Sequence, residues 1–428
     1  MNPVQKRRVV VTGLGIVTAI GVGLRDFERT LFAGRSGIGA VTLFDTAAYP
    51  CRLAAQVGEI DFAGHFDPRE RKRASRCDLL GMLAARHAWE DAGLGEAAHD
   101  DRRGIVLGGG AGGMRSWEVY RRTRREGRRP IAAPLLSSPP CTLTDRLARV
   151  YGLTGPRSTV TTACSSSSTA IGVAFDLIRS GRIDLAVTGG AEAMCELTFA
   201  GFNALRVMSP EACRPFDAER RGLSLGEGAA VLILEALDSA VERSAGIYAE
   251  LLGYAISGDA FHMTAPHPEG RGMRAAMVQA MSASGLPPDR IDYINAHGTA
   301  TSVNDPLETA AIKTIFGDEQ AHRLAVSSTK SMVGHCLGAA GGIEALATVL
   351  AVHRQMAPPT AGLVRTDPQC DLDYVPGRGR AMRIRHALSN SFAFGGNNTC
   401  IAFGRHEAAV PSVPPGDRAE ARGSGIGP

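Results

Sequence analysis

One cysteine in a run of small hydroxyl residues is the group in this chain best suited to nucleophilic chemistry. Cys164 follows the β-branched stretch 158–162 and precedes the largely apolar stretch 170–178, so the sequence predicts a strand, a turn and a helix. At a helix N-terminus, backbone N–H groups and the helix dipole stabilise a thiolate. We therefore expect a lowered pKa for the Cys164 thiol, and we expect iodoacetamide to label this cysteine first. The alternative is a buried structural cysteine, which is a common fate of free thiols.

Two histidines and a lysine are the other candidates for chemistry. His297 is followed by a glycine, His335 is preceded by one, and Lys330 lies shortly before His335. Lysine is rare in this arginine-rich chain and occurs only at positions 6, 72, 313 and 330. A compact ammonium fits where a planar guanidinium does not, which favours a special position for Lys330. The alternatives are a solvated surface lysine and histidines whose hydrogen bonds are satisfied in the core.

The composition indicates a soluble α/β protein, because 44% of the 428 residues are hydrophobic and 21% are charged. A net charge of +4 gives no general signature of nucleic-acid binding, and no apolar stretch is long enough to span a membrane. The nine cysteines are scattered without a CxxC pair, which disfavours zinc sites and disulfide frameworks and agrees with a reducing cytoplasm. We expect no bound metal and no cofactor.

Strands and helices must position these candidates. Val9 to Val11 is interpreted as the first core strand, followed by a glycine turn at Gly13 and Gly15 that lacks the third glycine of a dinucleotide-binding fingerprint. A basic helix is predicted to start at 67–76 and to continue to Asp91. Further strands are predicted at 104–107, 183–190, 229–234, 385–390 and 399–403.

A faint internal repeat divides the chain. The strand, small-residue turn and helix at 158–180 are echoed at 324–354, and the overlay places Cys164 and His335 at similar positions at the starts of two helices. We therefore expect two halves, 1–246 and 247–406, that face each other and bring both helix starts to one centre. Residues 407–428 are rich in proline and small residues, so we expect a disordered tail.

Positive charge is concentrated in two clusters of the first half. One lies in the predicted helix start at 67–76 and the other at 121–129. Either cluster alone is commonly a solvated surface. Two clusters on one half of a nearly neutral protein indicate an acidic partner.

Four motifs together resemble the β-ketoacyl-acyl carrier protein synthases of the thiolase fold, especially synthase II and the ketosynthase subunits of type II polyketide systems. The matching segments are 162–166, 295–301, 330–335 and 390–398, and the resemblance extends in order over about residues 7 to 405. It implies an α/β, thiolase-like fold in which two similar βαβ halves give a layered α-β-α-β-α arrangement.

The resemblance also implies a decarboxylative Claisen condensation, in fatty acid or type II polyketide biosynthesis. Cys164 would take an acyl group from carrier protein as a thioester, and malonyl thioester would then lose CO2 to give a carbanion that attacks the acyl-cysteine. Neutral His297 and His335 would each donate from Nε2 to the thioester oxygen on which charge develops. The backbone N–H groups of Cys164 and Phe394 would hold the second oxyanion.

Further residues carry roles by their match to the family. Lys330 would pair with Glu344 in an orienting role, with direct catalysis as the lesser alternative, and Phe394 would act as a gate. Expected substrate-binding residues are Thr299, Thr301, Thr264, Ala111, Phe202 and Phe392, and expected carrier-protein contacts are Arg69, Arg71, Lys72, Arg73, Arg124, Arg125 and Arg206. The implied partners are a carrier protein with a phosphopantetheine arm, and either a second copy of the chain or a chain-length-factor-like subunit. Nucleic acid and membranes are not expected partners.

Two departures from the family pattern bear on substrate choice. The gate segment has Ala393 and Asn397 where the family often has glycine and threonine. Ala111 stands where synthase II relatives often have a larger aliphatic residue. Two alternatives stay open: a non-catalytic chain-length-type subunit, although such subunits characteristically lack the cysteine, and an acyltransferase or thioester hydrolase that does not elongate.

Overall fold

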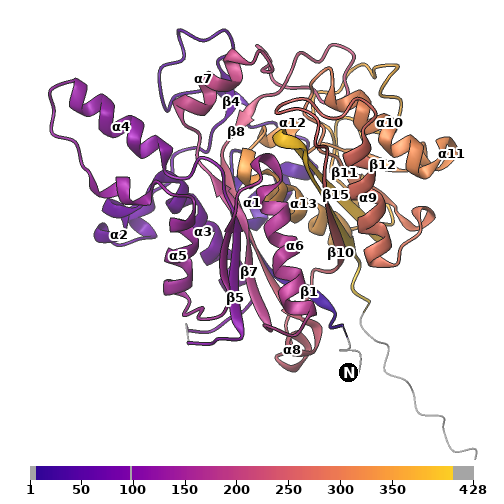
Figure 1. The fold of residues 1–428 in the computed structure, drawn as a ribbon, viewed down its shortest axis with the longest axis horizontal. Helices are drawn as coiled ribbons and strands as arrows, with labels where there is room; N and C mark the ends of the chain where they lie inside the picture. Colours follow the sequence, from indigo (N-terminus) through magenta and orange to yellow (C-terminus); the bar gives the residue numbers. More distant parts are fainter. Residues whose placement is uncertain (1–5, 97–98, 408–428) are drawn as a thin grey trace, which may run out of the picture.

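The computed structural model describes residues 6–96 and 99–407, so the tail predicted from 407 lies, after its first residue, outside the described residues. The main sheet of the described part has eleven strands, and helices lie on both faces of it (Figure 1). Ten of the strands follow one hydrogen-bonded path, and β2 (Gly21–Val22) pairs with β1 beside that path. The path divides into two groups of five that have the same topology.

The first group belongs to the N-terminal half. In spatial order its strands are β1 (Val9–Thr18), β9 (Gly228–Ala236), β7 (Leu185–Glu192), β5 (Arg103–Gly108) and β6 (Arg157–Val160). The first two pairings are antiparallel and the last two are parallel. Parallel neighbours such as β5 and β6 cannot be joined by a hairpin and need a crossover connection.

The second group repeats this arrangement in the C-terminal half. Its strands, in matching order, are β10 (Ala249–Gly258), β16 (Asn397–Gly404), β15 (His386–Ala393), β11 (Tyr293–Asn295) and β12 (Ala325–Ser327). Again two antiparallel pairings precede two parallel ones. The predicted internal repeat is therefore confirmed as a repeat of strand order and direction.

Two central helices separate the halves. Helix α6 (Ser166–Arg179) packs on β5 and β7 of its own half and on β10 and β16 of the other, while α13 (Ala340–Arg354) packs on β11 and β15 and also on β7 and β9. Every residue of α13 from Ala340 to Val352 is buried. A helix that is apolar on all sides is stable only in such an interior.

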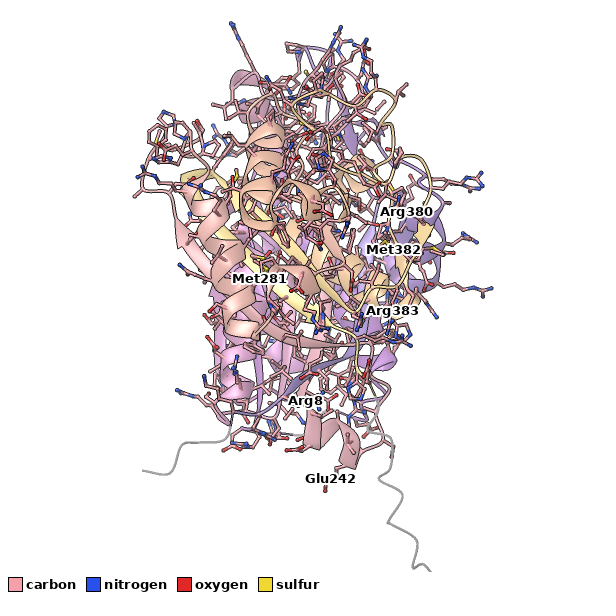
Figure 2. The ribbon with its side chains drawn as sticks, turned by 90° about the vertical axis from the view of Figure 1, so that its right-hand side faces the viewer. Arg8, Glu242, Met281, Arg380, Met382 and Arg383 are labelled. Carbon is pink, nitrogen blue, oxygen red and sulfur yellow. The ribbon has the colours of Figure 1, made fainter. Side chains whose placement is uncertain are left out.

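Outer helices complete the layers. Helices α3 (Arg76–Asp91) and α5 (Cys141–Val150) cover the N-terminal strands, and α9 (Arg271–Ser284) covers the C-terminal strands with α10 (Asn304–Phe316) beside it. Met281 of α9, labelled in Figure 2, is 3% exposed and belongs to the core under this helix. The layered α-β-α-β-α arrangement implied by the resemblance is thus confirmed.

The two halves join where β1 meets β10. Residues Val9 to Val11 pair antiparallel with Ala249 to Leu251. Arg8, at the lower end of the view in Figure 2, adds a bidentate ion pair to Glu250, with its Nε 2.8 Å from one carboxylate oxygen. This short junction links the two five-stranded groups into one sheet.

The predicted glycine turn after the first strand is wrong. Strand β1 continues through Gly13 and Gly15 to Thr18. A Cβ on Gly13 would lie 2.3 Å from the Ala88 carbonyl oxygen, and one on Gly15 would lie 1.9 Å from the Ala84 carbonyl oxygen. The glycines therefore allow α3 to approach the strand closely, a contact that is distant in sequence.

The predicted basic helix is divided in two. Helix α2 (Pro68–Arg73) ends at the extended residue Ala74, and α3 begins after Ser75. The Ser75 hydroxyl accepts from the Asp78 N–H, and the Asp78 carboxylate accepts from the Ser75 N–H. This reciprocal cap starts a new helix within the stretch that reads as one.

The remaining elements surround the layers. They are α1 (Leu24–Phe32), α4 (Met114–Arg125), α7 (Glu196–Ala204), α8 (Leu237–Glu242), α11 (Asp318–Ala321), α12 (Lys330–Val333), β3 (Gly39–Ala40), β4 (Leu53–Ala55), β8 (Leu225–Gly226), β13 (Met356–Ala357) and β14 (Arg380–Ala381). Short 3-10 turns are η1 (Phe62–Gly64), η2 (Ala133–Ser137), η3 (Ala163–Ser165), η4 (Pro288–Arg290), η5 (Leu337–Ala339) and η6 (Phe394–Gly396). Within the described ranges, no helix combines the length and the hydropathy that crossing a membrane requires.

Candidate active site

Cys164 lies in the turn η3, between the end of β6 and the start of α6, as the sequence predicts. The Ser166 hydroxyl holds this turn, because it donates to the Ala163 carbonyl at 2.6 Å and accepts from the Thr162 N–H at 2.9 Å. Ala163 has a left-handed φ of 52°, so the chain bends sharply before the thiol. Only 5% of Cys164 is exposed. The sulfur is thus presented from a fixed turn in the interior.

The expectation of a lowered thiol pKa is wrong. Burial raises the pKa of Cys164 to about 11, and the Lys330 ammonium and the Phe394 backbone N–H oppose this rise only in part. Loss of water around a thiolate outweighs these two stabilising contacts. The expected order of alkylation also needs correction, because Cys141 is exposed whereas Cys164 is buried.

His297 is held by two carboxylates of α10. Glu308 accepts the backbone N–H groups of His297 and Gly298, each at 2.9 Å, and Asp305 accepts the N–H of Thr299 at 3.0 Å. Both carboxylates are fully buried, and burial raises the pKa of Asp305 to about 6. The sequence interpretation missed this pair, although two acidic residues three positions apart, directly after the His297 motif, were its signal.

The two histidines have the same ring nitrogen protonated. His335 Nδ1 accepts the Leu337 backbone N–H at 3.2 Å. His297 Nδ1 lies 3.2 Å from Lys330 Nζ, and an ammonium can only donate. In a neutral imidazole with an accepting Nδ1, the proton is on Nε2. The two rings are 5.4 Å apart and nearly perpendicular.

Both rings are kept neutral by their surroundings. Burial lowers the pKa of His297 and of His335 well below 6.5, and the positive charge of Lys330 lowers both further. Each ring therefore offers one N–H donor without a charge. Such donors can stabilise a negative oxygen that forms between them.

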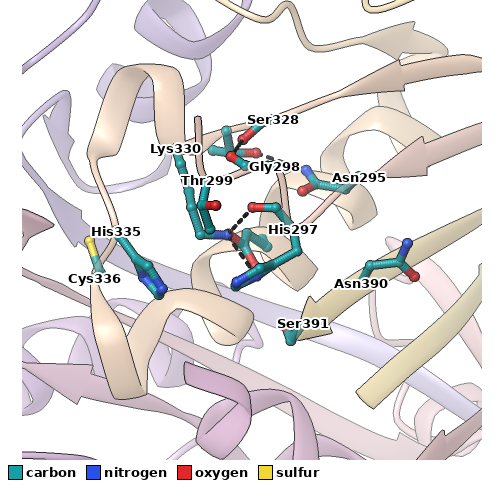
Figure 3. A network of polar contacts seen from close by, with 12 residues as sticks. Asn295, His297, Gly298, Thr299, Ser328, Lys330, His335, Cys336, Asn390 and Ser391 are labelled. Carbon is teal, nitrogen blue, oxygen red and sulfur yellow. Dashed lines mark hydrogen bonds and ion pairs between the residues drawn. The ribbon is translucent and has the colours of Figure 1, made fainter. Parts of the chain in front are cut away.

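Lys330 connects His297 to the central helix. Its ammonium donates to the His297 carbonyl oxygen at 2.6 Å and forms an ion pair with Glu344 of α13, and it is 1% exposed (Figure 3). Burial raises the pKa of Glu344, and the neighbouring ammonium opposes that rise. Lys330 contacts the ring and the main chain of His297, which fits the orienting role.

A cavity of about 340 Å³ connects these groups to the surface. Cys164, His297 and His335 line it, as do the predicted gate Phe394 and most of the residues predicted to bind substrate: Phe202, Thr264, Thr299, Thr301 and Phe392. Arg206, predicted as a carrier-protein contact, also lines it. Lys330 and Glu344 lie behind the lining. Residues from both halves therefore build one compartment with a thiol and two neutral N–H donors.

Aromatic side chains and hydroxyls shape this compartment. The Phe394 ring stacks on Phe202, with centroids 5.8 Å apart and an interplanar angle of 11°. The Phe392 ring lies 6.0 Å from that of His297. The hydroxyls of Thr299 and Thr301 are 2.9 Å apart.

Ala111 lies outside the lining of this cavity. Its backbone N–H donates at 2.8 Å to Glu192, the last residue of β7, which also accepts the Gly338 N–H at 3.0 Å. Glu192 is fully buried, and burial raises its pKa to about 7. The sequence interpretation missed this carboxylate, because the N–H groups that surround it come from segments far apart in the chain.

The remaining basic candidates lie on α2 and α4, both of which contact η2 on the same side of the molecule (Figure 1). Helix α2 carries Arg69, Arg71, Lys72 and Arg73, and α4 carries Arg124 and Arg125. All of these side chains are at least partly exposed. The two clusters thus form one basic face, which we call the α2–α4 face.

Comparison with protein families gives two matches that together span most of the chain. Residues 6–240 match the N-terminal domain of beta-ketoacyl synthase and residues 248–364 match its C-terminal domain. A 3-oxoacyl-[acyl-carrier-protein] synthase 2 from Synechocystis sp. is 43% identical over 420 residues, which cover 95% of this chain and 100% of the relative. A protein with the same name from Coxiella burnetii is 42% identical over 412 residues, with 94% and 99% covered.

Solved structures give the same picture. The ishigamide ketosynthase/chain length factor is similar with a TM-score of 0.87 and 37% identity, covering 94% of this chain and 100% of that one. A type II PKS acyl-carrier protein in complex with its ketosynthase contains a chain with a TM-score of 0.85 and 32% identity, with the same coverage.

Proposed function

The chain belongs to the beta-ketoacyl synthase family, and we propose that it joins a Cys164-bound acyl group to malonyl carrier protein by decarboxylative Claisen condensation. It is a condensing acyltransferase, a β-ketoacyl-acyl carrier protein synthase of fatty acid or type II polyketide biosynthesis. One observation carries the assignment of the site: a buried thiol and two neutral imidazoles, each with its Nε2 proton available, line the same cavity.

Loading is the first step. The Cys164 sulfur attacks the thioester carbonyl of acyl carrier protein, the phosphopantetheine sulfur leaves, and the Cys164 proton ends on that leaving sulfur. Because burial raises the pKa of the thiol to about 11, the reactive thiolate is a minor species at neutral pH. The backbone N–H of Phe394, which faces the thiol, would also stabilise the oxyanion of the tetrahedral intermediate.

Decarboxylation is the second step. Malonyl thioester loses CO2, and the electron pair of the broken bond moves onto the thioester oxygen as an enolate. His297 and His335 would donate their Nε2 protons as hydrogen bonds to this oxygen. Rings that were already cationic would repel the Lys330 ammonium, so neutral donors suit this interior.

Condensation completes the reaction. The enolate carbon attacks the acyl-cysteine carbonyl, a carbon–carbon bond forms, and the Cys164 thiolate leaves. Thr299, Thr301 and Thr264 would bind the arm that carries the malonyl group, and Phe202, Phe392 and Phe394 would line or gate the path. Ala111 would border the acyl group, since Gly108 of the same segment packs directly against Ser166 and Ser167.

The partner is a carrier protein with a phosphopantetheine arm, which would dock on the α2–α4 face and on Arg206. The assembly is a dimer, with a second copy or with a chain-length-type subunit. The boundary between the two halves would lie between residues 246 and 247. Free cysteines are typical of a reducing compartment, so we propose that the enzyme acts in the cytoplasm. The curated relatives favour the condensing enzyme over a non-catalytic subunit or a non-elongating acyltransferase.

Intact-mass analysis tests the function. The protein is mixed with a panel of acyl-carrier thioesters, and malonyl carrier protein is then added. We expect one acyl adduct, its discharge as a β-ketoacyl product and release of CO2. Cys164→Ala should form no adduct, whereas the matched variant Cys141→Ala, at the exposed cysteine, should load normally. An adduct that malonyl carrier protein never discharges would identify a non-elongating acyltransferase instead.

Charge reversal tests the docking face. A variant with Glu at Arg71, Lys72, Arg124 and Arg125 should load poorly from acyl carrier protein, and wild-type loading should weaken as salt is raised. Small acyl thioesters that lack the carrier protein should report whether the active site is intact. Equal losses with both substrate types would contradict docking on this face.

A further inference from the structure

Two arginines lie side by side at the exposed end of the cavity. Arg206 and Arg221 both line it, and both are exposed, whereas Cys164 at the other end is buried. Their backbones are in register, because Leu223 donates its N–H to the Val207 carbonyl at 2.9 Å, and Met208 and Leu223 form a parallel bridge. Each arginine immediately precedes these paired segments.

This pair is fixed to the loop that carries His297. The Gly222 N–H donates to the Ala300 carbonyl at 2.9 Å, and Arg220 Nε donates to the Thr301 carbonyl at 3.1 Å. The backbone around the two arginines is therefore held against the loop that carries Thr299 and Thr301. Both arginines are exposed, whereas Thr299 in the same cavity is buried.

Their hydrogen-bonding capacity is largely unused. The side chain of Arg220, next in sequence, is 6% exposed, donates to the carbonyls of Thr301 and Asp217, and forms an ion pair with Asp367. In contrast, Arg221 has one ion pair, a long contact of 3.8 Å to the exposed Glu211. The Arg206 side chain makes no hydrogen bond or ion pair with the residues that the structure describes.

We propose that Arg206 and Arg221 form a clamp for the phosphodiester that links the pantetheine arm to its carrier protein, an inference that rests on the proposed function. Guanidinium groups bind phosphate oxygens through paired, charge-assisted hydrogen bonds. The clamp would hold the charged end of the arm at the mouth while the thioester reaches Cys164. Two carboxylates near the mouth have other partners: Asp259 accepts from Asn398 and from the His267 N–H, and Glu211 also pairs with Arg214.

Two matched substrates test the clamp without a carrier protein. They are the acyl-4′-phosphopantetheine thioester and the acyl-pantetheine thioester, with whichever acyl group loads best in the panel above. Loading of Cys164 is followed by intact mass, and the ratio of the two second-order rate constants is the readout. We expect the wild type to prefer the phosphorylated substrate by about tenfold or more, since charge-assisted hydrogen bonds are at stake.

The variants are Arg206→Ala, Arg221→Ala and the double variant, in which the ratio should fall toward one. Arg221→Lys should keep part of the preference, because it keeps the charge but loses the paired geometry. Arg365→Ala is the matched control, since Arg365 is 68% exposed and pairs with Glu219 but does not line the cavity. It should keep the wild-type ratio.

Three outcomes would overturn the clamp: a wild type without preference, an unchanged ratio in the double variant, or an equal loss in Arg365→Ala. Each of them leaves Cys164 loading intact, so the proposed function would stand. If neither thioester, nor acyl carrier protein, loads Cys164, the proposed function itself fails. Loading from acyl carrier protein distinguishes contacts to the phosphate from contacts to the carrier protein. Arg124→Ala should slow loading from acyl carrier protein and leave loading from both small thioesters unchanged.

Discussion

Two short turns, η3 in the first half and η5 in the second, occupy equivalent positions in the repeat but differ in the residue that follows the bend. Each precedes a central helix, and each begins at a residue with a left-handed φ, 52° at Ala163 and 46° at Leu337. Turn η3 packs against β15, β16 and η6 of the other half, and η5 packs against β7 and β9. The next residue is Cys164 in one turn and Gly338 in the other.

The partners of the two turns differ in the same way. Cys164 faces the Phe394 N–H just beyond the end of β15, whereas Gly338 donates its N–H to Glu192 at the end of β7. Beside η3, the Phe394 N–H donor borders the cavity. Beside η5, the buried carboxylate of Glu192 occupies the equivalent position. The same strand, turn and helix arrangement thus carries the candidate nucleophile Cys164 in the first half and a packed structural turn in the second.

The comparison also corrects the sequence overlay. The overlay gives His335 and Cys164 equivalent positions, but by turn geometry Gly338 is the residue equivalent to Cys164, and His335 lies before the turn. His335 therefore reaches the cavity from the chain that leads into η5. The Leu337 N–H, which belongs to η5, fixes its tautomer. Turn η5 would thus support the proposed catalysis by orienting the His335 ring.

Removal of that ring should give the largest effect. His335→Ala should lower malonyl decarboxylation by about 10²–10³-fold, as expected when one donor to a developing oxyanion is lost. Loading of Cys164 should continue, because it needs a thiolate and not an enolate-stabilising donor. The measurements are CO2 release from malonyl carrier protein and intact-mass loading. CO2 release at the wild-type rate would remove His335 from this step.

The strands and helices that carry the candidate residues could be predicted from the sequence because they depend on local pattern. Strand, turn and helix around Cys164 follow from β-branched and apolar runs. The wrong predictions involve distant contacts. Gly13 and Gly15 were interpreted as a turn because the approach of α3 is invisible in sequence. The pKa of Cys164 was predicted from the helix N-terminus, whereas burial of the thiol raises it.

A change of pH should affect the loading of Cys164 and the decarboxylation step differently. Loading needs the Cys164 thiolate, so its rate should rise about tenfold per unit between about pH 7 and pH 9, well below the raised thiol pKa. Decarboxylation needs neutral rings, and a lowered pKa means that protonation begins only in acid. Its rate should therefore stay flat from about pH 8 down to about pH 6.5.

Stopped reactions with an acyl thioester measure loading, and the Cys164→Ala variant with malonyl carrier protein measures decarboxylation alone. Loading that levels off near neutral pH would show that the thiol titrates far below the value that its burial gives. A decarboxylation rate that already falls near pH 7 would place a charge on His297 or His335 in that range.

Gly338→Ala should test the supporting turn. A Cβ there would lie 2.6 Å from the Gly110 nitrogen and 2.8 Å from Glu192 Oε2, and the backbone cannot move aside easily. We expect the free energy of unfolding to fall by about 3 kcal/mol, the upper end of the usual cost of overpacking. Gly201→Ala on α7, where nothing lies within 4 Å, is the matched control and should cost nothing. Denaturant unfolding of both variants gives the difference, and equal stability would mean that η5 is not tightly packed.

Substitution of Ala111 should give the smallest effect. It tests whether the acyl chain on Cys164 extends along the segment 108–111. Its segment begins beside α6, where a Cβ on Gly108 would lie 2.2 Å from the Ser167 nitrogen, and it ends on Glu192 through the Ala111 N–H. The segment therefore runs from the reactive turn to the supporting carboxylate. If the acyl chain follows it, each methylene buried there contributes about 0.8 kcal/mol. A larger side chain would take that space.

Ala111→Ile should disfavour long acyl groups by roughly tenfold relative to short ones, because overpacking a filled pocket costs about 1–3 kcal/mol. The measurement is loading of Cys164 by a graded series of acyl-carrier thioesters. Ala111→Gly, which keeps the N–H that Glu192 accepts, is the control and should leave long chains accepted. An unchanged length profile in the Ile variant would mean that the segment between the two turns serves only the supporting side. The acyl chain would then have to leave Cys164 by another path.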